Sequence, residues 1–396
     1  MSQRNHLIDF WRGVALMMIF INHVPGNLLE KLTSRNVGFS DGAEAFVFIA
    51  GLSVALIFLR EPKAGETRVT ILSLTARCWK RALELYRIHV VLSFGVLALF
   101  ALAYAVFQEP VFRNGAGRAF VFDQPESGFL AIALLAHQFD YIDILPLYVV
   151  LMAMAPLMLA LLRRNVVAGL ALSIAIYLGA RLTHLDMPTW LENRAWFFNP
   201  FAWQLIFTLG AAAGLVWRGK SLPRSGWLIY PSAAIVALGA VIVSDAFGLA
   251  PGLQLALRDY LDTGKHNLGL TRLVHFLALA YLLAALPWGA WLSSTKIGQE
   301  FVLWGRNALP VFVLGTVLSE LCQLTMAASA VTFDINPQPV GLAATLAGLT
   351  VLSTQARYIE WQKRHPGSGL LSLVRAALPA LGWPSSWLPA PSRFRP

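Results

Sequence analysis

The chain has 396 residues, of which 57% are hydrophobic and only 13% are charged. Its mean hydropathy is +0.60. This composition excludes a soluble globular protein and favours a membrane protein that crosses the bilayer several times. The net charge of +10 is spread over many loops rather than gathered in one patch, which argues against a nucleic-acid partner. Cys78 and Cys322 fall in or beside apolar runs, so we expect no disulfide, thiolate chemistry or metal site.

Apolar runs long enough to span a membrane recur along the chain. They cover residues 7–24, 41–60, 79–107, 141–162, 165–185, 200–217, 227–248, 270–292, 303–325 and 337–358. We therefore expect an all-α polytopic membrane protein, a bundle of about ten transmembrane helices. The run 128–138 is short enough to be a re-entrant or interfacial piece, and eleven spans remain the alternative.

The distribution of basic residues predicts the orientation of this bundle. With the N-terminus inside, 20 of the 31 lysines and arginines fall in cytoplasmic segments, against seven in outer loops. The positive-inside rule then places both the N-terminus and the C-terminus in the cytoplasm. We expect residues 1–362 to form the transmembrane domain, and the Pro- and Ser-rich residues 363–396 to form a cytoplasmic tail.

The first apolar run carries ionisable groups that hydrocarbon should exclude. Arg12 and His23 share one helix face and lie about 16 Å apart along the axis, while Asp9 lies one turn from Arg12 and can pair with it. Charged groups at membrane depth usually face a protein-lined or watery interior. These residues therefore indicate a functional site between helices.

The second apolar run places Asp41, Glu44, Gly51 and Ala55 on one stripe. The two small residues predict close packing against another helix. The two acids lie at the start of the run, one short loop away from His23, so the acids and the imidazole are expected at the same depth.

Several stretches resemble a known family. They read IDFWRGVALMMIFINHVPGN, SDGAEAFVFIAGLSVAL, ARCWKRALELYRIHV, LPLYVVLMAMAP, FFNPFAWQLIFTLG, KHNLGLTRLVHFLALA and GRNALPVFVLGTVLSE, and they extend from residue 8 to about 320. In this order they resemble the OpgC family, inner-membrane proteins that succinylate osmoregulated periplasmic glucans, within the acyltransferase 3 superfamily.

The resemblance implies a membrane-bound O-acyltransferase. The enzyme would lie in the bacterial inner membrane. It would move an acyl group, expected to be succinyl, from cytoplasmic acyl-CoA to hydroxyls of a periplasmic glucan. Acyl-CoA would be a co-substrate, with no tightly bound cofactor and no metal. The superfamily's arginine and histidine motif falls on Arg12 and His23. Its pair of arginines three residues apart falls on Arg77 and Lys80, so a lysine replaces the second arginine, with Arg81 next to it.

Acyl transfer to a hydroxyl needs a base and an oxyanion donor. His23 is the candidate base, and its alternative is a histidine satisfied by a neighbouring carbonyl. Glu44 or Asp41 would orient the imidazole, with Glu44 favoured because Asp41 suits a helix N-terminus. Asn22 is the candidate oxyanion donor, although it points about 100° away from His23 on an ideal helix.

Three basic residues, Arg77, Lys80 and Arg81, are expected to bind the phosphates of the acyl carrier. The alternative is that they only orient the protein in the membrane. Arg12 is either the partner of Asp9 or part of the path of the acyl donor.

A succinyl donor ends in a carboxylate, which a buried arginine could bind through two hydrogen bonds. The candidates are Arg87 and Arg272, with His275 one turn from Arg272. Two other classes of function stay open: a polytopic transporter, and an enzyme that uses an acetyl donor or another envelope glycan. The expected partners are membrane lipid, acyl-CoA and the glucan, while the oligomeric state stays open, with a homodimer as one alternative.

Overall fold

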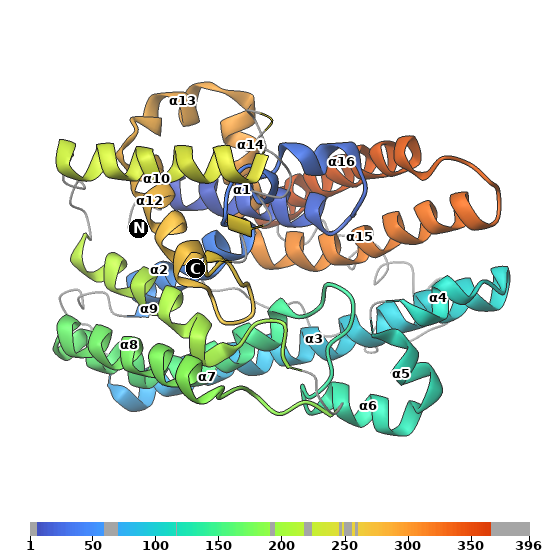
Figure 1. Cartoon of the computed structure of the whole chain (residues 1–396), viewed down its shortest axis with the longest axis horizontal. Coiled ribbons are helices and arrows are strands. Elements are labelled where there is room, and N and C mark those ends of the chain that lie inside the picture. Colours follow the sequence, from blue (N-terminus) through green and yellow to red (C-terminus); the bar gives the residue numbers. More distant parts are fainter. Residues whose placement is uncertain are drawn as a thin grey trace.

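The computed structural model describes residues 6–58, 70–115, 117–190, 195–217, 224–244, 248, 256–257 and 260–365. Throughout these residues the regular secondary structure is helical, and none of them is in a strand (Figure 1). The predicted all-α class is therefore confirmed. The expected tail from residue 366 onward lies outside the described residues.

A helix occupies each of the ten ranges predicted from the sequence. The elements are α1 (His6–Asn22), η1 (Leu28–Leu32), η2 (Ser34–Asn36), α2 (Gly42–Phe58), α3 (Ile71–Phe107), α4 (Pro110–Asn114), α5 (Arg118–Asp123), α6 (Pro125–Ala133), α7 (Ile144–Arg164), α8 (Val166–Thr183), α9 (Pro200–Val216), α10 (Gly226–Ser244), α12 (Leu270–Ala285), α13 (Trp288–Ser294), α14 (Lys296–Arg306), α15 (Ala308–Val331) and α16 (Pro337–Arg364).

Six of these helices, α3, α7, α8, α10, α15 and α16, are long and apolar enough to cross a membrane. The shorter α2, α9 and α12 are apolar as well. The several apolar helices support a membrane protein, whereas the count of ten spans and the placement of the two ends stay predictions.

Some helix boundaries differ from those predicted. The run 270–292 does not form one helix, because α12 ends at Ala285 just before Pro287, whose ring prevents the helix from continuing. The run 303–325 is divided by Asn307, which separates the amphipathic α14 from α15. At the other extreme, α3 begins at Ile71, eight residues before the predicted start.

Helices α2 and α9 pack closely through small residues. A Cβ atom at Gly51 of α2 would collide with the carbonyl oxygen of Phe207, and one at Gly210 of α9 would collide with that of Phe48. Ala55 meets the next glycine of α9, Gly214. The close approach predicted at Gly51 and Ala55 is confirmed.

Helices α1 and α14 cross in the same way, because Gly13 faces the carbonyl of Phe301 and Gly305 faces that of Asp9. This contact brings the end of α14 against the charged half of α1, beside Arg12. In Figure 1, α15 and α16 lie side by side, and α3 runs past α7.

Candidate active site

A cavity of about 350 Å³ lies where α1 ends and where α2, α7 and α12 begin. We call it the His23 pocket. Its polar and charged lining includes Asn22, His23, Arg35, Asp41, Asp143, Lys265 and Arg272. The cavity therefore brings together candidate residues from the first two apolar runs and from α12, more than 200 positions later in the chain.

His23 lies in the turn that follows α1 and is half-buried. Its imidazole stacks on Tyr141, with ring centroids 4.4 Å apart and an interplanar angle of 19°. Gln323 of α15 donates a 2.9 Å hydrogen bond to the His23 backbone carbonyl. Among the described residues neither ring nitrogen has a hydrogen-bond partner. His23 is thus held by the stacking of its ring and by its backbone carbonyl, while the two ring nitrogens remain available to a substrate.

A cluster of buried polar side chains lies next to Tyr141 and Gln323, two residues that contact His23. Glu320 of α15 is buried here, and Asp140, which precedes Tyr141, pairs with Arg118. Glu320 accepts a 3.4 Å hydrogen bond from Gln323. The residue that holds the His23 carbonyl is therefore itself held by a buried carboxylate.

Asp41 and Glu44 together cap α2. The Asp41 side chain accepts from the Ala43 N–H at 2.8 Å, and Glu44 accepts from the Asp41 N–H at 2.8 Å, which is a capping box. The second Glu44 oxygen accepts from Arg272 Nε. Both oxygens of Glu44 are thus occupied by groups other than His23, and the carboxylates that line the pocket with His23 are Asp41 and Asp143. That Glu44 orients the imidazole stays a prediction without a supporting contact.

Lys265 and Arg272 balance these carboxylates. Lys265 Nζ lies 2.7 Å and Arg272 Nη2 lies 3.1 Å from the same Asp41 oxygen. Arg272 is therefore shared between Asp41 and Glu44 rather than free to bind a carboxylate ligand. Asp143, in the loop before α7, is buried and lines the same pocket. Lys265 and Tyr141 are site residues that sequence reasoning missed. Lys265 lies in a loop, where periodicity gives no signal, and Tyr141 is the first residue of the predicted run 141–162, where an aromatic side chain does not stand out.

Two other candidates lie in or near the pocket. Asn22 lines it, and the Asn22 side-chain oxygen accepts a 2.7 Å hydrogen bond from Thr33 Oγ1. His275 is buried behind the wall, where its Nδ1 lies 2.8 Å from Ser40 Oγ and its ring packs against Gly38. His275 thus holds the segment that leads into Asp41 rather than lining the cavity.

A second and larger cavity, of about 790 Å³, lies at the opposite end of α1 and α2. We call it the basic pocket. Six cationic side chains line it: Arg12, Arg77, Lys80, Arg81, Arg306 and Lys363. The three predicted phosphate-binding residues of α3 are therefore gathered in one cavity, together with two cations from α14 and α16 that the sequence did not indicate.

The acids near the basic pocket offset only part of this charge. Asp9 pairs with Arg12 at 3.1 Å, as predicted, and lies 3.8 Å from Arg306. Glu84 pairs with Arg81, and Glu360 pairs with Lys363, each at 2.7 Å. Within the described part of the chain, Arg77 and Lys80 have no carboxylate partner. The cavity therefore carries excess positive charge.

Arg87 differs from its prediction. It was expected to be a buried arginine, but its side chain is exposed on α3, and it lines neither pocket. Glu84, three residues before Arg87 on the same helix, pairs with Arg81. The reason is helical phase, because Arg87 follows Arg81 by six residues and so points to a different side of α3.

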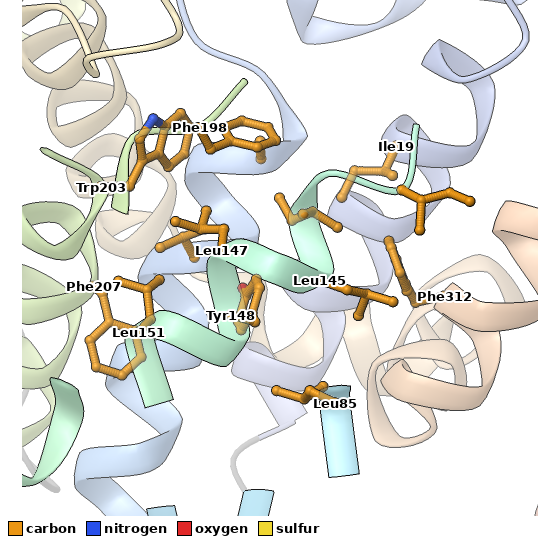
Figure 2. Close-up of a cluster of buried hydrophobic side chains, with 14 of the residues drawn as sticks. Ile19, Leu85, Leu145, Leu147, Tyr148, Leu151, Phe198, Trp203, Phe207 and Phe312 are labelled. Atoms are coloured by element: carbon orange, nitrogen blue, oxygen red, sulfur yellow. The ribbon is translucent and has the colours of Figure 1, made fainter. Parts of the chain in front are cut away.

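The two pockets meet at the first turn of α7, where Ile144 lines both. Figure 2 shows the apolar side chains around this turn: Ile19 of α1 and Phe198 lie toward the His23 pocket, whereas Leu145, Tyr148 and Phe312 line the basic pocket. Ile144 and its apolar neighbours therefore form a partition between a cavity that holds an imidazole and one rich in cations.

The sequence model of the OpgC protein family matches residues 4–364, nearly the whole chain. No curated protein and no solved structure matches this chain. The family match supports an acyltransferase-like role in modifying periplasmic glucans. The chain is a member of the OpgC family.

Proposed function

We propose that this protein is a membrane O-acyltransferase that takes an acyl group, succinyl in our assignment, from acyl-CoA and transfers it to a hydroxyl of an osmoregulated periplasmic glucan. The observation that carries the proposal is the pair of pockets: a basic cavity and a histidine-bearing cavity at opposite ends of α1, with Ile144 in the wall of both. With the expected orientation, the basic pocket opens to the cytoplasm and the His23 pocket to the periplasm.

The basic pocket suits the phosphates of coenzyme A. Arg77 and Lys80 lie on the exposed face at the start of α3 and lack acidic partners among the described residues, so a phosphate would meet cations that are not already neutralised. The long pantetheine arm would then follow the apolar lining toward Tyr148 and Ile144. A thioester at its end would arrive at the partition beside the His23 pocket.

In the His23 pocket, a nitrogen of the imidazole would accept the proton of a glucan hydroxyl. The hydroxyl oxygen would attack the thioester carbonyl carbon, the carbon–sulfur bond would break, and the coenzyme A thiolate would take up the proton. Asn22, whose side-chain oxygen is engaged by Thr33, would donate from its amide nitrogen to the oxyanion. An acyl-histidine intermediate is the alternative route through the same residue.

The test uses the purified protein in detergent or liposomes, with acyl-CoA and periplasmic glucan. We expect glucan-dependent release of coenzyme A and a glucan that becomes anionic with succinyl-CoA. Acetylation without succinylation would change the donor assignment. Absence of any glucan-dependent release, by protein that binds acyl-CoA, would reject the proposed reaction.

A further inference from the structure

The wall of the His23 pocket that faces the loops contains an aromatic ring beside a charged pair. Phe197 lines the pocket and is 50% exposed. Lys265 Nζ lies 5.6 Å from the centre of that ring and 2.7 Å from Asp41 Oδ2. An exposed apolar face, an ammonium and a carboxylate thus lie side by side in one cavity with His23.

The charges of this wall are balanced. Asp41 is shared by Lys265 and Arg272, and Arg272 also binds Glu44. The wall therefore presents hydrogen-bond donors and acceptors without a large net charge. Such a surface suits a neutral polyhydroxylated ligand better than an anion, in contrast to the basic pocket.

A sugar ring matches these groups. Neighbouring hydroxyls both donate and accept hydrogen bonds, so an ammonium with three donors and a carboxylate that only accepts can bind them together. The C–H face of the ring is apolar and can lie on an exposed aromatic side chain.

The loop that carries Lys265 is anchored independently of its side chain. The backbone carbonyl of Lys265 accepts a 2.9 Å hydrogen bond from the indole of Trp203, which is fully buried in α9. The Asn199 N–H donates to the next carbonyl, that of His266, at 3.0 Å. The backbone position of Lys265 is thus fixed without its ammonium group.

We propose that Phe197, Lys265 and Asp41 form the subsite that binds a sugar unit of the acceptor and presents one of its hydroxyls to His23. The inference rests on the proposed acyl transfer and adds to it the residues that recognise the acceptor. Lys265 and Asp41 bind hydroxyls, and Phe197 carries the ring face.

The experiment is steady-state kinetics with the two substrates varied separately. Lys265→Met should raise the KM for glucan by about tenfold or more, because a hydrogen bond to a charged group is lost. Lys265→Arg, which keeps the charge, should retain more of the affinity. Phe197→Leu should raise the same KM by about three- to tenfold. In all three variants the KM for acyl-CoA should stay within about twofold of the wild type, since the basic pocket is untouched.

Lys31→Met is the matched control, because Lys31 is exposed on η1 and lines neither pocket. Its kinetics should equal those of the wild type. An unchanged KM for glucan in both Lys265→Met and Phe197→Leu would overturn the subsite, as would equal rises in both KM values with a lower Tm, which would show a structural role. If the wild type itself shows no glucan-dependent release of coenzyme A, the proposed function fails instead.

Discussion

The His23 pocket and the basic pocket share Ile144 but differ in how their charges are arranged. In the His23 pocket, Lys265 and Arg272 meet the carboxylates of Asp41 and Glu44 within hydrogen-bond distance. In the basic pocket, Arg77 and Lys80 have no acidic partner among the described residues. From this difference we infer that the basic pocket attracts an anion, whereas the His23 pocket aligns a neutral group beside the imidazole.

The largest expected effect comes from removing the imidazole. His23→Ala should lower kcat for glucan-dependent acyl transfer by about 10²- to 10⁴-fold, because general-base assistance is lost. Binding of acyl-CoA, measured by calorimetry, should change less than about twofold, since His23 lies in the other pocket. Turnover at the wild-type rate would refute the assignment of His23 as base.

Removing Arg77 and Lys80, which have no acidic partner among the described residues, should affect the other side of the partition. The double variant Arg77→Ala and Lys80→Ala should raise the KM for acyl-CoA by about 10- to 100-fold, since charge-assisted hydrogen bonds to phosphate are lost. The KM for glucan should stay near that of the wild type. Arg87→Ala is a control on the same helix, because Arg87 lines neither pocket. If the double variant binds acyl-CoA normally, the basic pocket is not the carrier site.

A larger side chain in the shared wall should separate binding from turnover. Ile144→Phe adds volume where the pockets meet, so we expect kcat to fall by about tenfold, while both substrates still bind at their own ends. Ile144→Val, which removes one methylene, should cost less than about 1.5 kcal/mol of stability and leave kcat close to that of the wild type. A higher kcat in Ile144→Phe, or loss of binding of both substrates, would contradict the claim that Ile144 stands between the two substrate sites.

The smallest effect is expected from a substitution of Gln323, which holds the backbone of His23, rather than of His23 itself. Gln323→Leu removes the 2.9 Å hydrogen bond to the His23 carbonyl but leaves the imidazole in place. Loss of one such bond amounts to about 0.5–1.5 kcal/mol, so we expect kcat to fall by about two- to tenfold. The KM for acyl-CoA should not change. A loss as large as that of His23→Ala would mean that Gln323 contacts the substrates directly.

The sequence predicted the helices well because apolar runs of membrane length leave few other structures. A helix is found in every predicted range, and the small residues Gly51 and Ala55 mark a close helix crossing. It predicted less well where polar features interrupt the runs. Pro287 ends α12 early. Because α14 is amphipathic, hydropathy did not predict it as a helix, and its last four residues fell into the run predicted for α15.

The site was predictable at the level of helix ends but not of side-chain partners. His23, Asp41 and Arg272 do come together. Depth along a helix, however, does not say which way a carboxylate turns, and Glu44 turns to Arg272 and to its own helix N-terminus. Lys265 lies in a loop, where neither periodicity nor hydropathy indicates a position.

The central claim is that the two substrates reach one reaction centre from opposite ends of the bundle. Proteoliposomes of uniform orientation test it most directly, with acyl-CoA supplied on one face and glucan on the other. The account predicts transfer only when acyl-CoA is on the face of the basic pocket and glucan is on the face of the His23 pocket. Transfer that requires both substrates on the same face would contradict it.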